Sequence, residues 1–288
     1  MTSSVPDLRV STSRTELITP EPAEALAGLL DLDPPAAGEP LPALWHWVYL
    51  LERRRQGELG PDGHPTHGVP APPAAGQLRM FAGGRVCLRT PLRFGEPATR
   101  TTRVGRTTHK QGASGPLTFV TVRSEIEQQG RVAIVDEQDI VYRPHGRALE
   151  ARPDSRTADR PPAPGLVLDV DPVLLFRFSA LTYNAHRVHY DQAHAAAEGY
   201  PALVVHGPLQ ALLMGELMRR AGAALLGQEF AYRLVAPVFG AQRLTATALD
   251  SSMTAVHVLD GTGQVTATST LRPSTADAPT RSHHAPHS

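Results

Sequence analysis

The chain has 288 residues, 41% of them hydrophobic and 19% charged, which suits one large domain or two small ones with a real core. Lys plus Arg and Asp plus Glu both number 28, so no net charge favours nucleic acid or an anionic membrane surface as a partner. The single cysteine, Cys87, excludes an intrachain disulfide framework and is typical of a reducing compartment. No run of apolar residues is long enough to span a membrane, so we expect a cytoplasmic protein.

The N-terminal part of the chain shows one helical pattern between two irregular stretches. Residues 1–20 predict a flexible leader without the apolar run of a signal peptide. Residues 44–55, L-W-H-W-V-Y-L-L-E-R-R-R, predict a helix that ends at Gln56-Gly57. A loop dense in Pro and Gly follows, and we interpret its His64 and His67 as solvated side chains, although either could reach a ligand.

Four strand-like runs follow without helices between them, at residues 85–92, 99–108, 117–126 and 132–142. Gln129-Gly130 predicts a turn between the last two. Because parallel strands need long crossovers, this order predicts an antiparallel sheet. The polar, Pro-rich residues 145–165 then predict a linker, so that the first domain covers residues 21–144.

The second half repeats this plan, with a helix at about 208–221 and a Gly turn at 261–263. Its predicted strands are residues 230–235, 244–249, 254–259 and 265–271. We place the second domain at 166–272 and a disordered tail at 273–288. The pattern alone predicts an α+β protein with an antiparallel sheet and two similar halves.

The densest chemistry lies in residues 178–213. The segment from Phe178 to Asp191 reads F-S-A-L-T-Y-N-A-H-R-V-H-Y-D, which is too polar for a core strand and too rich in titratable groups for an ordinary turn. Downstream, an apolar run ends at His206-Gly207-Pro208 and opens a helix. A helix N-terminus offers free N–H groups to an oxygen that gains negative charge. The pairing of histidines with such a helix start predicts an enzyme that acts on a carbonyl compound.

The same segment resembles, without gaps, the signature F-A-x-L-S-G-D-x-N-P-I-H-x-D of MaoC-type enoyl-CoA hydratases. It is more similar still to S-A-L-T-F-N-x-H-R-I-H-Y-D, the pattern of the hydroxyacyl-thioester dehydratase branch that includes mesaconyl-C4-CoA hydratases. Residues 79–85, 110–115 and 137–143 also resemble that branch. The resemblance covers about residues 40–272 and implies a double hotdog fold, in which two curved antiparallel sheets each wrap around a long helix, with catalysis in the second half only.

Residue by residue, the resemblance places the family's histidine on His189 and its aspartate on Asn184, with His186 and Arg187 at the next motif positions. An asparagine cannot ionise, so Asn184 can only hold a water or hydroxyl through hydrogen bonds. His189 is therefore the expected proton carrier. The Gly207 N–H is the expected donor to the thioester oxygen, because Pro208 has no N–H.

Further residues are predicted to contact the substrate from around this catalytic set. Asp191 also fits an orienting or helix-capping role, and the cationic side chains could meet nucleotide phosphates or a substrate carboxylate. The predicted contacts are Thr182, Tyr183, His186, Arg187, Asp191, His206, Arg233 and Lys110. No Cys or carboxylate completes a convincing metal site with the histidines, and the resemblance implies no metal and no cofactor.

The resulting prediction is a hydro-lyase that adds water to, or removes it from, a 2-enoyl or 3-hydroxyacyl thioester. The expected partner is an acyl-CoA or an acyl carrier protein thioester, and the expected assembly is a homodimer. Two alternatives remain open: a hotdog thioesterase, which usually needs a carboxylate near the thioester, and a non-catalytic acyl-binding hotdog protein.

Overall fold

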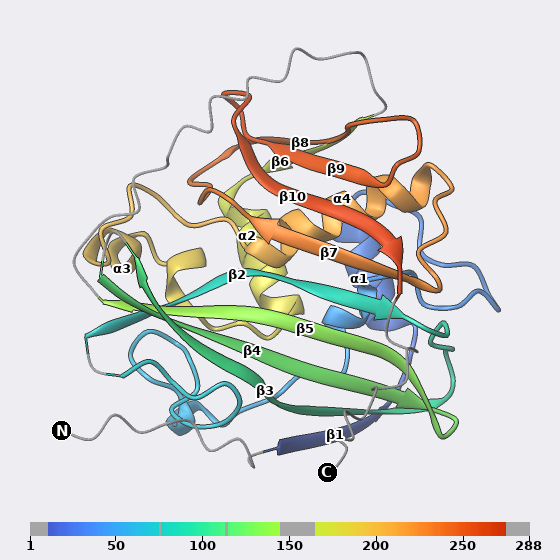
Figure 1. Cartoon of the computed structure of the whole chain (residues 1–288), viewed down its shortest axis with the longest axis horizontal. Helices are drawn as coiled ribbons and strands as arrows, with labels where there is room; N and C mark the ends of the chain where they lie inside the picture. The colour runs from blue at the N-terminus through green and yellow to red at the C-terminus, as the bar shows by residue number, and fades with distance from the viewer. Residues whose placement is uncertain (1–10, 75, 113–114, 145–164, 275–288) are drawn as a thin grey trace, which may run out of the picture.

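The computed structural model describes residues 11–74, 76–112, 115–144 and 165–274. Ten strands in these ranges form one antiparallel sheet in the order β1-β3-β4-β5-β2-β7-β10-β9-β8-β6 (Figure 1). The strands are β1 (Ser11–Leu17), β2 (Gln77–Leu88), β3 (Pro97–Gly112), β4 (Gly115–Gln128), β5 (Arg131–Pro144), β6 (Gly165–Val170), β7 (Gln228–Leu234), β8 (Gln242–Ala248), β9 (Ala255–Leu259) and β10 (Val265–Pro273). The predicted antiparallel α+β class is confirmed.

The first five strands form one half of this sheet and the last five form the other. The halves join edge to edge where β2 pairs with β7, from Gly83 opposite Arg233 to Cys87 opposite Glu229. Both predicted hairpin turns are present: Gln129-Gly130 joins β4 to β5 with positive φ at both residues, and residues 261–263 join β9 to β10. The repeat seen in the sequence is therefore one five-stranded unit used twice.

The C-terminal half wraps around the helix α4 (Gly207–Arg220), as the sequence predicts. Every residue of α4 from Leu209 to Met218 is buried, and the helix contacts five strands of its own half as well as β2. A helix that is apolar on nearly all sides is stable only when it is surrounded in this way. The C-terminal half is thus a complete hotdog unit.

The described part of the N-terminal half contains no long helix, and the helix predicted at 44–55 is wrong. Only the short 3₁₀ turn η1 (Trp45–Val48) forms there, after the nine-residue helix α1 (Glu21–Leu29). Tyr49 is extended and Leu50 has φ 55, so the backbone leaves the helical region. The reason is tertiary: the Trp47 Nε1 donates to Asp136 Oδ2 at 2.7 Å, and the Tyr49 hydroxyl donates to the Thr19 carbonyl at 2.7 Å in another direction.

The predicted leader also needs a correction. Residues 1–10 lie outside the described range, but β1 adds an edge strand next to β3, with Ser11 opposite Arg103 and Leu17 opposite Pro97. The residues of β1 are mostly polar and show no apolar alternation, so the sequence does not indicate a strand here. Backbone hydrogen bonds to β3 hold the strand in place. Ile18, which follows β1, is fully buried.

The domain ends fall largely on residues that the structure does not describe. Most of the predicted linker, 145–164, and most of the predicted tail, 275–288, lie outside the described ranges. Gly165, placed in the linker by the sequence, opens β6, and Pro273 closes β10.

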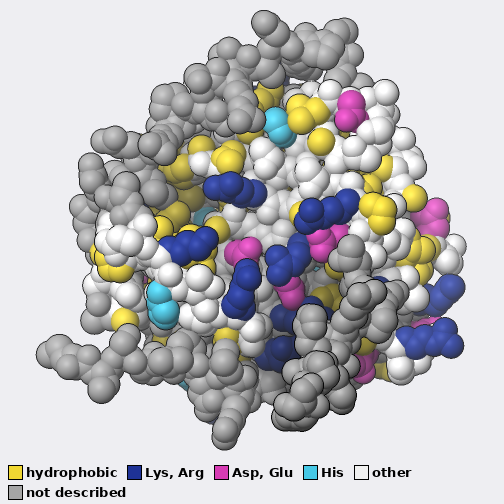
Figure 2. All heavy atoms as spheres, viewed as in Figure 1, with side chains coloured by type: hydrophobic (Ala, Val, Ile, Leu, Met, Phe, Trp, Pro, Cys, Tyr) yellow, Lys and Arg dark blue, Asp and Glu magenta, His cyan; other side chains and the backbone are white. Residues whose placement is uncertain are grey.

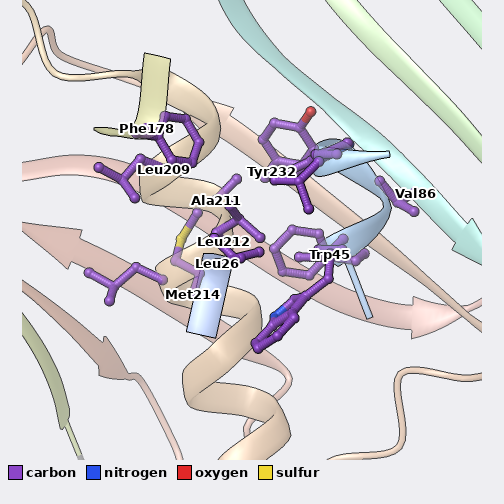
Figure 3. Packing of buried hydrophobic residues seen from close by; sticks show 14 of the residues in the cluster. Leu26, Trp45, Val86, Phe178, Leu209, Ala211, Leu212, Met214 and Tyr232 are labelled. Atoms are coloured by element: carbon purple, nitrogen blue, oxygen red, sulfur yellow. The ribbon is translucent and has the colours of Figure 1, made fainter. Parts of the chain in front are cut away.

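One hydrophobic core runs through both halves. Figure 3 shows Leu26 of α1 and Trp45 of η1 close to Leu212 and Met214 of α4, with Val86 of β2 at the same junction. These residues belong to a single cluster that also includes Phe178 and Tyr232. The two units therefore share one interior.

The outer face of the sheet is polar. Figure 2 shows basic and acidic side chains mixed over the middle of the molecule. On the sheet, Arg123 lies 2.7 Å from Glu125 and 2.8 Å from Glu137, and Arg85 also pairs with Glu137. Exposed pairs of this kind solvate a sheet face and contribute little each to stability. Within the described residues, no helix has the length and apolar character needed to cross a membrane.

Candidate active site

A cavity of about 1080 Å³ is lined by residues of both halves. The N-terminal half contributes the segment 47–70 and inward-facing residues of β2 and β5, including Phe81 and Ile140. The C-terminal half contributes the segment 176–190, the start of α4 and the end of β7. The residues predicted as catalytic, Asn184, His189 and Gly207, all border this one cavity.

The polar motif follows a short helix that delivers it to the cavity. The helix α2 (Pro172–Leu181) starts at Asp171, whose carboxylate accepts the Leu174 N–H at 2.7 Å. It ends at Thr182, whose hydroxyl donates to the Phe178 carbonyl at 2.7 Å. Tyr183 then takes φ 52, which turns the chain into the cavity wall. Thr182 and Tyr183 both line the cavity, Tyr183 at an exposed position.

His189 lies in the 3₁₀ turn η3 (Arg187–His189) and is 9% exposed. Its Nδ1 is 2.7 Å from the Val204 carbonyl oxygen, which can only accept, so Nδ1 carries the proton and Nε2 keeps its lone pair. Burial, the largest influence, lowers the pKa of His189 to about 4. His189 is therefore a neutral imidazole with a free basic nitrogen at neutral pH.

His206 supports the His189 ring from behind. The two rings stack with centroids 3.7 Å apart and planes at 20°. The His206 Nε2 is 2.8 Å from the Ser179 Oγ, which fixes the ring, and only 1% of His206 is exposed. Burial also holds the pKa of His206 well below its usual value, so this ring is neutral. His206 therefore packs against His189 and also borders the cavity, and its contact with the substrate stays a prediction.

Asn184 and His186 are joined by a local hydrogen bond. The Asn184 Oδ1 accepts the His186 N–H at 3.0 Å, which leaves the Asn184 amide NH₂ as a donor. Burial, followed by the positive potential of His64 and His189, lowers the pKa of His186 to about 2. Both residues line the cavity. Asn184 can therefore donate to a water or hydroxyl oxygen, and His186 forms an uncharged part of the cavity wall.

Gly207 begins α4 at a place where no side chain fits. A Cβ there would lie 2.2 Å from Leu234 Cδ1 and 2.9 Å from Phe81 Cδ1, so even alanine would force both neighbours to shift. The N-terminal end of α4 carries the positive end of the helix dipole and N–H groups without helical partners. Glycine at this position therefore lets Leu234 and Phe81 pack closely against the start of α4, which borders the cavity.

A loop of the N-terminal half reaches into the same region, which the sequence did not predict. The Asp62 carboxylate accepts from the His64 N–H at 3.0 Å and from its Nδ1 at 2.9 Å, and the His64 ring lies 4.1 Å from the His186 ring. This hydrogen bond is the largest influence lowering the pKa of Asp62. His64 lines the cavity, so its interpretation as a solvated loop side chain is wrong.

The docking of this loop depends on glycine and on Arg187. A Cβ at Gly63 would lie 1.8 Å from the Ala185 carbonyl oxygen, so only glycine allows this approach. The Arg187 guanidinium donates to the Pro61 carbonyl at 2.9 Å. The proline-glycine spacing in residues 60–70 indicated a loop, but nothing local indicated what it would touch.

Three of these side chains are the candidate metal ligands among the described residues. Ligand atoms of Asp62, His64 and His186 all lie within 4.8 Å of one another. Asp62 and His64 already satisfy each other through their hydrogen bonds, which accounts for their approach without an ion. Another histidine near the motif, His194, has its Nε2 3.0 Å from the Glu198 carboxylate.

Four of the predicted substrate contacts do not line the cavity. Arg187 forms a two-pronged pair with Asp191 at 2.7 and 3.1 Å, and Asp191 also caps the helix α3 (Gln192–Ala197) by accepting the His194 N–H. Arg233 is exposed, and the Lys110 ammonium lies over the Phe119 ring. These four do not border the cavity, so their contact with the substrate stays a prediction from the sequence. The structure brings Arg79 and Arg100 to the cavity instead.

Comparison with known proteins agrees with this geometry. The family model described as hydroxyacyl-thioester dehydratase type 2 matches residues 44–240. The mesaconyl-C(4)-CoA hydratase of Chloroflexus aurantiacus is 46% identical over 226 residues, which are 75% of this chain and 79% of that protein. The mitochondrial hydroxyacyl-thioester dehydratase type 2 of Schizosaccharomyces pombe is 31% identical over 43% of this chain and 42% of its own length.

Solved structures of low sequence identity share the fold. HtdX of Mycobacterium tuberculosis has a TM-score of 0.67 at 14% identity, covering 92% of this chain and 100% of its own. A MaoC-like dehydratase from Phytophthora capsici has a TM-score of 0.65 at 14% identity, covering 92% and 96%. The predicted double hotdog is confirmed. The chain belongs to the hydroxyacyl-thioester dehydratase type 2 family, and it is a hydro-lyase with a double hotdog fold.

Proposed function

We propose that this protein hydrates a 2-enoyl thioester of CoA of the mesaconyl-C4-CoA type, with His189 as the proton carrier. The observation that carries the proposal is the placement of the His189 imidazole, the Asn184 amide and the Gly207 backbone on one cavity. The relative that is 46% identical acts on mesaconyl-C4-CoA by its name. That substrate is an enoyl thioester with a free carboxylate on the carbon β to the thioester.

The His189 Nε2 removes a proton from water, and the water oxygen attacks C3 of the enoyl group. The Val204 carbonyl holds the opposite nitrogen at 2.7 Å, so the imidazole keeps the required tautomer throughout. Once protonated, His189 returns the proton to C2, which completes the addition of water. Acid–base help of this kind contributes ~10²–10⁴-fold to the rate.

Asn184 and Gly207 act on the two oxygens of the reaction. The Asn184 amide donates to the attacking water, since its own oxygen is held by the His186 N–H. The negative charge that develops on the thioester oxygen faces the Gly207 N–H at the start of α4. One such donor in a dry site is worth roughly 10²–10³-fold. Dehydration runs through the same steps in reverse.

The thioesterase alternative lacks its usual carboxylate. Within the described residues, Glu52 is the one acid that lines the cavity, and it is ion-paired with Arg54. Asp191, the acid nearest in sequence to His189, is bound by Arg187 and caps α3. Neither is free to attack a thioester or to activate water beside it.

The test is to incubate the protein separately with mesaconyl-C4-CoA, crotonyl-CoA and a 3-hydroxyacyl-CoA, and to follow enoyl-thioester absorbance and free thiol together. A hydro-lyase changes the absorbance without releasing thiol. Thiol release without hydration would assign a thioesterase, and binding without either change would assign a non-catalytic acyl-binding protein. A carrier-protein thioester assayed in parallel tests the preference for CoA.

The setting of the enzyme stays a prediction from its composition and family. We expect a homodimer, which light scattering of the purified protein would test. We expect a reducing compartment such as the cytoplasm, because the one cysteine, Cys87, is buried and free.

A further inference from the structure

The cavity contains a cationic group that has no partner. Arg79 lines the cavity from β2, and within the described residues its guanidinium forms no hydrogen bond and no ion pair. The groups that act on it electrostatically are Tyr142, Asp62 and Glu52, and the two carboxylates are held by His64 and Arg54. Burial lowers the pKa of Arg79, but a guanidinium stays charged in proteins. The site therefore holds a positive charge without a contacting counter-ion among the described residues, which an anionic ligand would stabilise.

Arg79 lies beside the start of α4. It is two residues from Phe81, before the irregularity of β2, so both side chains point to the same face of the sheet about 7 Å apart along the strand. Phe81 is the ring that would touch a Cβ at Gly207. Arg79 also contributes to the low pKa of His186. The guanidinium is thus a near neighbour of the place where the reacting carbons would sit.

The two other arginines of the cavity are less suited to this role. Arg54 is paired with Glu52. Arg100 on β3 lies opposite Ile126 of β4, which lies opposite Ile134 of β5. Ile134 in turn lies opposite Leu88 at the far end of β2. Leu88 is seven residues beyond Phe81, which puts Arg100 roughly 20 Å from Gly207 along the strand direction. A group attached to the reacting carbons would reach Arg79 first.

We propose that Arg79 binds a carboxylate that the acyl group carries on C3, and that this contact makes the enzyme select 2-enoyl thioesters with a free carboxylate there. The inference rests on the proposed function and names the residue that reads its substrate class. A guanidinium can donate two parallel hydrogen bonds to a carboxylate, which fixes orientation as well as charge. Because C3 is the carbon that water attacks, the contact between Arg79 and the carboxylate also determines which face of the double bond is presented to His189.

The test uses unreactive saturated analogues, so that binding is measured apart from catalysis. Methylsuccinyl-CoA joined through C4 carries the carboxylate, and isovaleryl-CoA has a methyl group of similar size in its place. Calorimetry should show that Arg79→Gln weakens methylsuccinyl-CoA binding roughly 10- to 100-fold and changes isovaleryl-CoA binding less than about threefold. Arg79→Lys should recover part of the difference, since it keeps the charge without the two-pronged geometry.

Arg103→Gln is the matched control, because Arg103 is an exposed arginine of the same half and is absent from the cavity wall. It should leave both affinities unchanged. Equal weakening of both analogues by Arg79→Gln, or selective weakening by Arg100→Gln instead, would overturn the assignment of Arg79. Turnover of mesaconyl-C4-CoA by the wild-type enzyme is judged separately: its absence, with crotonyl-CoA still hydrated, would refute the proposed substrate and not the fold or the hydro-lyase activity. Melting temperatures of all variants show that each is folded.

Discussion

In the C-terminal half, five strands wrap around α4, and the concave face is filled by residues from Leu209 to Met218. In the described part of the N-terminal half, the same strand plan is accompanied by α1, η1 and the loop that follows them, and α4 of the other half contacts β2. Inner-face residues such as Phe81 and Ile140 border the cavity there, where the other half has its helix. We propose that the same unit serves once as the scaffold for the catalytic groups and once as the part of the cavity that receives the acyl group.

The difference shows how a duplicated fold can divide its work. A buried helix positions a backbone N–H and a histidine precisely, but it leaves no room for a substrate. In the described part of the N-terminal half, a loop lies beside the cavity and brings Asp62 and His64 to the motif. The predictions below test whether the chemistry belongs to the C-terminal half and the substrate selection to the N-terminal half.

The largest effect is expected from His189→Ala. Loss of the one proton carrier should lower kcat by ~10³-fold or more, because both proton transfers use its Nε2. Steady-state hydration kinetics measure this, and circular dichroism confirms folding. A folded variant that retained more than a tenth of the wild-type rate would move the chemistry away from this residue.

Asn184→Ala should lower kcat by roughly 10²-fold, since a single donor to the attacking water is lost. Asn184→Asp restores the acid that MaoC-type enzymes carry at this motif position. It should retain more activity than Asn184→Ala, and its rate should gain a new dependence on pH. If Asn184→Ala had the same rate as the wild-type enzyme, positioning of water by residue 184 would play no part in the reaction.

The pH profile should reveal the unusual state of His189. Its pKa is lowered to about 4, so the basic form persists above that pH, and kcat/KM should fall ~tenfold per pH unit only below it. The free energy of unfolding also falls as the pH falls. In the unfolded chain His189 binds a proton near pH 6.5, whereas in the folded chain it binds one only near pH 4, so acid favours unfolding. Rates below pH 5 therefore need circular dichroism on the same samples. A kinetic midpoint near 6.5 would mean that His189 is solvated in the working enzyme.

The smallest effect is expected from the N-terminal half. His64→Gln removes the ring that packs on His186 but no group that moves a proton in the proposed mechanism, so kcat should fall about 2- to 10-fold. Asp62→Asn should have a similar effect by loosening His64. Losses near 10²-fold, or losses that zinc reversed after treatment with a chelator, would show that the N-terminal half takes part in the chemistry.

Much of the site could be predicted from residues that are close in sequence. The eight residues from Asn184 to Asp191, and the Gly-Pro start of α4, are local patterns whose side-chain types already limit the chemistry. Strand and turn signals placed most of the sheet for the same reason: β-branched alternation and the Gln129-Gly130 turn act over a few residues.

What only the tertiary structure decided depends on partners distant in the chain. Residues 44–55 look helical, but Trp47 and Tyr49 form hydrogen bonds to Asp136 and to the Thr19 carbonyl, which are distant in the chain, and the backbone leaves the helical region. The polar strand β1 forms because β3 has an open edge. Arg79 borders the cavity because of the face of β2 on which it lies, and among the described residues no acid is paired with it. No local sequence pattern encodes either feature. Sequence determined which groups are present, and long-range packing decided which of them meet, because burial and unpaired charge are properties of the assembled interior.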